Sequence, residues 1–240
     1  MLPIARSEFL QIVRNRMVFV SATIVPVGLS FVFISQREVF AQSPTGVGLL
    51  AGAFMMILIS MGLYSTAVTT LAARRQTLFL KRLRSTAVSD GAALSGIVIP
   101  PAIIGIVQVT AVLAVLASID APPAEPLLLV VSGLALVLMM LGFALATAGI
   151  TQSPEHAQVT TLPITLGASA IAFWIGFTGT EELTPLKRLL PGGAATELTI
   201  SAWNGGAEWG ESLLLLAPTA GWIVVAVVLA KSMFRWEPRR

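Results

Sequence analysis

Long apolar stretches alternate with short polar ones along the chain. A helix needs about 20 consecutive apolar residues to cross a hydrocarbon core about 30 Å thick. Six stretches meet this requirement: residues 17–35, 46–73, 92–119, 127–150, 157–179 and 212–234. The pattern therefore predicts an all-α integral membrane protein, in which residues 1–240 form a single transmembrane domain with six transmembrane helices.

The N-terminal segment has a helical periodicity of its own. Within residues 1–16, Leu2 and Phe9 fall on one helical face, opposite Glu8 and Arg14. At about 100° per residue, this is the pattern of an amphipathic helix that lies in the plane of the membrane interface.

The segment between the second and third apolar stretches, residues 74–90, is strongly basic and also amphipathic. It contains five Lys or Arg residues and one acid. Four of its apolar residues fall within one arc of a helix; they are Phe79, Leu80, Leu83 and Ala87. We expect a short helix at the membrane edge.

Residues 180–211 form the longest segment on the opposite side of the predicted membrane. Leucines recur at helical spacing between Pro185 and Pro191, and a Gly-Gly break follows. We expect two short helices that dip into the outer interface before the last span. Trp203 and Trp209 would then lie at headgroup depth.

The distribution of charge assigns the sides of the membrane. Of 15 Lys and Arg residues, 12 lie in the two termini and in residues 74–84, which six spans place on one side. By the positive-inside rule both termini are cytoplasmic. The net charge of +3 then reflects topology, and no nucleic-acid partner is expected. Arg outnumbers Lys by twelve to three, which favours the cell membrane of a GC-rich bacterium.

The chain offers little catalytic chemistry of its own. A Walker ATPase needs Gly-x-x-x-x-Gly-Lys-Ser/Thr, and none of Lys81, Lys187 and Lys231 follows a glycine. Six spans and Gly167-Ala168-Ser169-Ala170 invite comparison with rhomboid intramembrane proteases, whose nucleophilic Ser sits in Gly-x-Ser-Gly with a histidine on a later helix. Position 170 is Ala, and the only histidine, His156, precedes Ser169. No cysteine is present for a disulfide or a thiolate metal site. We expect a protein that is not an enzyme by itself and that holds no cofactor or metal.

Two further questions stay open from pattern alone. The six apolar stretches contain no Asp, Glu, His or Arg, which disfavours ion-coupled secondary transport. Sodium can nevertheless be bound by carbonyls and hydroxyls alone. The basic helix of residues 74–90 fits an anchor on anionic lipid as well as it fits a contact with a partner protein.

Two segments resemble a known family. Residues 74–96 (RRQTLFLKRLRSTAVSDGAALSG) are similar to the signature of ABC-2 type transporter permeases, an Arg-rich turn followed by Thr-Leu-x-x-Leu-Arg-x-Thr-x-Val-Ser. Residues 183–205 (LTPLKRLLPGGAATELTISAWNG) are similar to the family's extracellular proline-bounded segment before the last span. The departures are Arg75 and Gln76, where many members carry Glu and Gly, and Ala87, where many carry Pro.

The resemblance implies partners and site residues. In that family, the segment matching residues 74–90 is a cytoplasmic coupling helix that docks on a separate subunit, and this subunit binds ATP and Mg²⁺. The expected partners are two ATP-binding subunits, a second permease chain that is identical or related, and membrane lipids. The residues expected to contact the ATP-binding subunit are Arg74, Arg75, Thr77, Leu80, Lys81, Arg82, Leu83, Arg84 and Ser89. The residues expected to line the translocation path are Ser21, Thr23, Ser60, Tyr64, Ser65, Thr161, Thr165 and Ser169.

The implied function is that of the membrane-spanning permease subunit of an ATP-binding cassette exporter. It would move a lipophilic substrate, drug-like or lipid, outward, as the daunorubicin-type drug-efflux permeases do. Three alternatives stay open. They are a secondary transporter or channel without ATP coupling, export of a lipid-linked glycan by the same architecture, and a membrane-embedded enzyme or sensor that uses the basic helix as a lipid anchor.

Overall fold

The computed structural model describes residues 2–86, 88–206, 209–234 and 236, and every regular element within them is helical. In chain order, with η for π-helix, the elements are α1 (Leu2–Arg14), α2 (Arg16–Phe19), η1 (Val20–Ile24), α3 (Val25–Ser35), α4 (Arg37–Phe40), α5 (Gly48–Ile57), η2 (Leu58–Ser65), α6 (Thr66–Gln76), α7 (Phe79–Arg84), α8 (Asp90–Ile119), α9 (Pro126–Ile150), α10 (Pro154–Thr178), α11 (Thr184–Leu189), α12 (Gly193–Asn204), α13 (Trp209–Leu215) and α14 (Ala217–Met233). The prediction of an all-α protein is confirmed.

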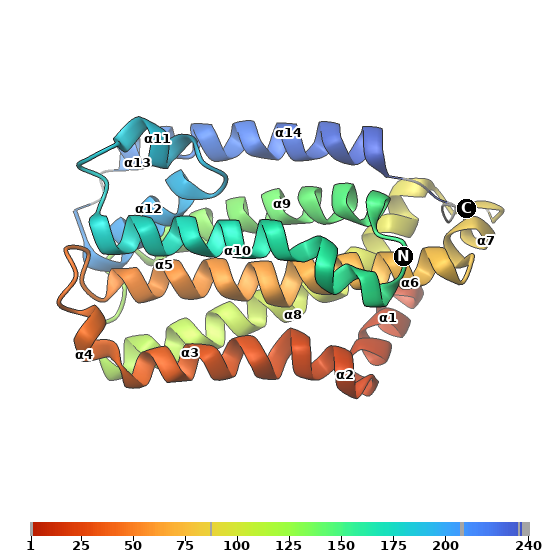
Figure 1. Ribbon diagram of the computed structural model, residues 1–240, viewed down its shortest axis with the longest axis horizontal. Helices are drawn as coiled ribbons and strands as arrows, with labels where there is room; N and C mark the ends of the chain where they lie inside the picture. Colours follow the sequence, from red (N-terminus) through yellow and green to blue (C-terminus); the bar gives the residue numbers. More distant parts are fainter. Residues whose placement is uncertain (1, 87, 207–208, 235, 237–240) are drawn as a thin grey trace.

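One continuous rod, made of α5, η2 and α6, occupies the centre of the bundle. Its most apolar 18-residue window is 89% buried, far more than that of any other long helix. The helices α8, α9, α10 and α12 pack around it, and α14 packs on the outer side of α9. Figure 1 shows these long helices running side by side along one axis. A helix that is apolar all round belongs in such a central position.

Five helices are long and apolar enough to cross a membrane: Gly48–Gln76, Asp90–Ile119, Pro126–Ile150, Pro154–Thr178 and Trp209–Met233. They coincide with five of the six predicted spans. The first predicted span, residues 17–35, is not confirmed in the same way. Its apolar part is the shorter helix Val20–Ser35, in which a π-helical turn precedes α3.

Close approach between the long helices depends on glycine. A Cβ atom on Gly142 of α9 would lie 2.7 Å from the Cβ of Ala226 in α14, and one on Gly105 of α8 would lie 2.9 Å from the Cβ of Leu63 in η2. Within a membrane, small residues let helix backbones approach and gain packing contacts that lipid does not offer. These two glycines therefore set how tightly α14 and α8 pack.

The N-terminal amphipathic helix is present as α1, which crosses the end of the bundle at a steep angle to the long helices (Figure 1). It packs along α8. Ile4 of α1 and Trp236 near the C-terminus pack on the same apolar cluster. The two described ends of the chain therefore lie at the same end of the bundle.

At the opposite end lies the segment of residues 180–211. Two short helices, α11 and α12, lie in this segment, and α13 continues with α14 as the last long helix, Trp209–Met233. Ten of the twelve residues of α12 are buried, because this helix inserts between α5 and α9. Trp203 is consequently only 4% exposed, while Trp209 is 44% exposed. The headgroup depth of both residues stays a prediction.

Candidate functional site

The basic helix α7 begins at a sharp reversal of the chain. Leu78 separates α6 from α7 and has φ = 57°, a left-handed conformation that commonly ends a helix but is usually left to glycine. The Thr77 hydroxyl donates to the carbonyl of Ala73, 3.1 Å away, in the last turn of α6. Figure 1 shows that α7 projects beyond the ends of α9 and α14.

The apolar side of α7 packs on the protein itself. Leu80 is fully buried in a small cluster with Leu71 of α6, Ile97 of α8 and Ala148 of α9. Phe79 is half-buried against the same cluster, and Leu83 is half-buried as well. Leu80, predicted to contact a partner, is therefore an internal anchor. Ala87, assigned to the same face from the sequence, lies outside the described residues.

The polar side of α7 presents three exposed cations: Lys81, Arg82 and Arg84. Arg82 donates through Nη2 to the carbonyl of Thr77 at 3.2 Å. Arg84 forms an exposed ion pair with Asp90, with Nε 3.5 Å from Oδ1, and its guanidinium lies 5.3 Å from the centre of the Trp236 ring. Thr77 and Ser89, also predicted to contact the partner, are exposed beside them.

Arg74 connects the base of α7 to the amphipathic helix α1. Its Nε lies 2.7 Å from Oε1 of Glu8, and its Nη2 donates to Oε2 at 2.9 Å. The same Nη2 also donates to the side-chain oxygen of Gln11. The carboxylate is 1% exposed and the guanidinium 18%. This ion pair and the hydrogen bonds from Nη2 to Glu8 and Gln11 hold α1 against the end of α6.

Arg75 is turned into the protein, which corrects its assignment to the partner surface. It is 2% exposed. Its guanidinium donates to the carbonyl oxygens of Ala148 (2.7 Å), Gly149 (3.3 Å) and Thr151 at the C-terminal end of α9. The last carbonyls of a helix lack partners and carry the negative end of its dipole. Arg75 satisfies them and so joins the base of α7 to α9.

Ser89 has a structural role at the other end of the basic segment. Its side chain accepts a hydrogen bond from the backbone N–H of Ala92 at 3.4 Å and caps the start of α8. Asp90 follows in the first turn, where a negative charge is favourable. The segment is thus bounded by the ends of two long helices.

The residues predicted to line a translocation path are divided among three places. Thr161, Thr165 and Ser169 share one face of α10, and the Ser65 hydroxyl of η2 lies 3.5 Å from that of Thr165. Tyr64 and Ser60 are buried in the core, where the Tyr64 hydroxyl lies 3.0 Å from that of Thr147 in α9.

Ser21 and Thr23 lie in η1, the third of these places, where Ser21 is exposed and Thr23 is half-buried. The structure therefore brings together Ser65, Thr161, Thr165 and Ser169 at one seam, and leaves the other four apart.

Sequence reasoning missed Gln108, which joins α8 to η1. Its Nε2 donates to the carbonyl of Ala22 at 3.0 Å and to the hydroxyl of Thr23 at 2.9 Å. A Cβ on Gly62 of η2 would lie 2.5 Å from Oε1 of Gln108, so a larger residue there would displace the end of this side chain. The sequence did contain a signal for this contact, because an amide side chain in the middle of an apolar stretch is expected to form hydrogen bonds to another helix.

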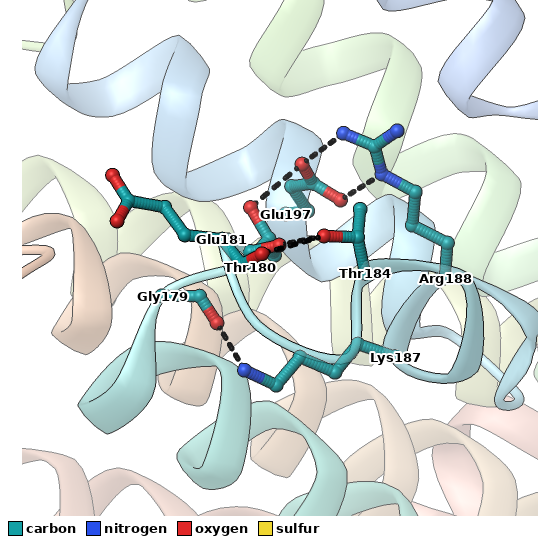
Figure 2. Close-up of polar contacts among 7 residues, drawn as sticks. All are labelled: Gly179, Thr180, Glu181, Thr184, Lys187, Arg188 and Glu197. Carbon is teal, nitrogen blue, oxygen red and sulfur yellow. Dashed lines mark hydrogen bonds and ion pairs between the residues drawn. The ribbon is translucent and has the colours of Figure 1, made fainter.

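A second polar cluster, also missed, holds the opposite end of the bundle. The guanidinium of Arg188 in α11 donates two hydrogen bonds to the carboxylate of Glu197 in α12. They run from Nε to Oε2 and from Nη2 to Oε1, and both are 2.7 Å long. The Thr180 hydroxyl donates to the same carboxylate at 2.9 Å. The hydrogen bonding of the Arg188 guanidinium to Glu197 raises the pKa of Arg188. Figure 2 shows these side chains converging on Glu197.

Lys187, beside this cluster, is 1% exposed and ties α11 to the end of α10. Its Nζ donates to the carbonyl of Gly179 at 2.7 Å (Figure 2) and to the hydroxyl of Thr178 at 2.8 Å. It also lies 5.3 Å from the centre of the Trp174 ring. Arg188 therefore holds α12 to α11, and Lys187 holds α11 to the end of α10.

Comparison with known proteins agrees with this architecture. The family described as "ABC-2 family transporter protein" matches residues 7–230. No match was found among curated proteins. The matched region runs from α1 through α14 and includes the basic helix α7 with its two arginine contacts. This chain, a multi-pass membrane protein, belongs to the ABC-2 family of transporter proteins, whose members are permease components that work with an ATP-binding partner.

Proposed function

We propose that this chain is the membrane-spanning subunit of an ATP-driven exporter, and that a separate ATP-binding subunit acts on it through α7. The observation that carries the proposal is the division of α7 into two sides. Leu80 is fully buried, while Lys81, Arg82 and Arg84 are exposed at the end of the bundle. Three cations in an exposed row suit a partner surface that carries acidic groups.

The same division argues against α7 as a lipid anchor. An amphipathic helix binds a membrane by inserting its apolar face below the headgroups. In this chain that face is already covered by α6, α8 and α9. Of the described residues between 74 and 90, Leu78 alone is a large apolar side chain with substantial exposure, 46%. One exposed leucine gives little area for insertion.

The contacts of Arg74 and Arg75 would transmit movement of α7 to the rest of the chain. A push on α7 reaches α1 through the ion pair with Glu8, and reaches α9 through the carbonyls of Ala148 and Gly149. It also reaches the central rod directly, because only Thr77 and Leu78 separate α6 from α7. In this proposal ATP and Mg²⁺ bind on the partner, and the chain moves as a consequence of nucleotide-driven closure there.

The proposed cargo is lipophilic and leaves the cell. The hydroxyl seam of Ser65, Thr161, Thr165 and Ser169 is the candidate path, since it separates α10 from the central rod and carries no charge. Ser65 belongs to the π-helix η2, and π-helical turns are frequently found at functional sites. We further propose that the chain crosses the membrane six times, that α2 to α3 forms the first crossing, and that both termini are cytoplasmic. In this proposal the chain also pairs with a second permease chain.

The experiment that tests this function is a double charge reversal on α7. Arg82→Glu with Arg84→Glu is expected to abolish stimulation of the partner's ATPase by cargo, while the protein inserts and is purified normally. The matched control is Arg14→Glu with Arg16→Glu, a reversal of two exposed arginines at the same end of the bundle, which is expected to leave stimulation intact. Normal stimulation by the α7 variant would contradict the proposal.

A further inference from the structure

A cleft of about 310 Å³ opens between α8 and α9, towards the end of the bundle that carries α12. The central rod contributes Met55 and Ile59, α8 contributes Ile106 and Leu113, α9 contributes Leu134, and Trp203 of α12 also lines the cleft. Pro123 of the loop that joins α8 to α9 and Pro126, the first residue of α9, also line the cleft. Two helices that are consecutive in the chain are therefore held apart along one side.

The lining of this cleft is almost entirely hydrocarbon. Thr110 is the one residue with a polar side-chain oxygen, and the sole other polar group among the lining side chains is the indole N–H of Trp203. Water needs two to four polar partners to be held in a cavity, so this cleft does not suit it. Several residues at its edges, including Ile106, Val130 and Leu134, are 40–55% exposed. The cleft is therefore open sideways, to the medium around the spanning helices.

The rim of the cleft at this end is the loop of residues 120–125, whose Pro123 lines the cleft. This loop is acidic and is hydrogen-bonded to α12. The backbone N–H of Glu125 donates to the carbonyl of Ala202 at 2.8 Å, and that of Ala124 donates to the carbonyl of Trp203 at 3.1 Å. These bonds hold residues 120–125 against α12. That loop carries two acids, Asp120 and Glu125, and no cation, and Asp120 is exposed. A ligand that lies over this rim is favoured if it carries a cation at its polar end.

From these features we infer that the cleft holds one acyl chain of an amine-bearing phospholipid of the outer leaflet, with its ammonium group over Asp120 and Glu125. The inference rests on the proposed membrane placement of the chain. An acyl chain gains no hydrophobic free energy on moving from lipid to protein, because lipid tails are as apolar as leucine. Preference therefore comes from the fit of one chain between α8 and α9 and from the acidic rim.

Trp203 provides the probe, because a brominated acyl chain quenches an indole only on close approach. A full-length protein with Trp203 as the sole tryptophan, the other four being Phe, is reconstituted in phosphatidylcholine vesicles. Dibrominated phosphatidylethanolamine or dibrominated phosphatidylglycerol is then added in rising mole fraction. Quenching by the ethanolamine lipid is expected to saturate, with a midpoint at about threefold lower mole fraction than for the glycerol lipid.

Two exposed alanines of α8 give a matched pair of variants. Ala114 lines the cleft and Ala111 does not, although both are exposed on the same helix. Ala114→Phe should remove the saturable quenching, and Ala111→Phe should retain it. If the single-tryptophan protein does not fold, the difference in quenching between the natural chain and Trp203→Phe gives the same signal.

Three results would overturn the inference. They are quenching that rises linearly and equally for both lipids, quenching that survives Ala114→Phe, and no quenching at all, as expected if another protein chain covers the cleft. The measurement uses neither ATP nor a partner subunit. Loss of lipid binding is therefore distinguishable from failure of the proposed coupling through α7, which is read from ATPase stimulation.

Discussion

The Nη1 atom of Arg75 lies 2.7 Å from the carbonyl oxygen of Ala148, so the end of α6 is fastened to the end of α9. This contact places a buried cation on the carbonyls that a helix leaves without partners. Its neighbour Arg74 makes a comparable attachment to Glu8 of α1. Two consecutive arginines at the base of α7 thus join it to two different helices.

Replacing Arg75 should destabilise the bundle without touching the exposed surface of α7. Arg75→Met is expected to lower the free energy of unfolding by roughly 3 kcal/mol, because charge-assisted hydrogen bonds are lost and buried carbonyls are left without partners. Denaturation in mixed detergent micelles measures this. Arg14→Met, at an exposed arginine, should change the same quantity by less than about 0.5 kcal/mol. Equal effects of the two substitutions would refute the role given to Arg75.

The ion pair between Arg74 and Glu8 should show strong coupling in a double-mutant cycle. Glu8→Gln and Arg74→Gln each remove one member of a pair whose carboxylate is 1% exposed. Their combined effect on stability is expected to fall short of the sum by about 1–3 kcal/mol, as for residues in direct contact. Additive effects would show that α1 is not held by this pair.

Gly142 should not tolerate a methyl group. A Cβ at this position would lie 2.7 Å from that of Ala226, so Gly142→Ala is expected to cost about 1–3 kcal/mol through overpacking of α9 against α14. Gly167 is the control, since a Cβ there meets nothing within 4 Å. Gly167→Ala should leave the protein as stable or raise its stability by up to about 1 kcal/mol. Thermal denaturation measures the stability of both variants. A Gly167→Ala protein that is less stable than the Gly142→Ala protein would contradict this role of Gly142.

Removing the amide of Gln108 should loosen η1. Gln108→Leu deletes hydrogen bonds to Ala22 and Thr23, and bonds of this kind within membranes contribute about 0.6 kcal/mol each on average. Hydrogen exchange at residues 20–24 is therefore expected to accelerate severalfold, with no change in α14. Gln158→Leu, at an exposed position on α10, should have no such effect. Unchanged exchange in η1 would mean that Gln108 does not hold it.

Much of the fold follows from the apolar periodicity of the sequence. Five long apolar helices, the amphipathic helix α1 and the short helix α7 were predictable, because each depends on local pattern. For the long helices, the length needed to cross a membrane adds to this signal. The insertion of α12 was not predictable. Its Glu197 and Thr196 read as polar surface residues, and they are buried because Arg188 and the neighbouring helices cover them.

The candidate site could be predicted in position but not in detail. The basic run identified α7, yet it could not separate Arg75, which caps α9, from Arg82, which is exposed. The two residues have the same chemistry, and their roles differ only because the chain reverses at Leu78. Long-range contacts of this kind, such as Arg74 with Glu8, leave no signal in a single sequence.

The central claim is that the exposed cations of α7 touch an ATP-binding partner. The chain contains no cysteine, so a single Arg82→Cys or Arg14→Cys substitution gives one unique attachment point for a short thiol-reactive photo-crosslinker. In native membranes, Arg82→Cys is expected to crosslink to a protein that carries a Walker motif, identified by mass spectrometry, and Arg14→Cys is not. Crosslinks from Arg82→Cys to lipid alone would contradict the account.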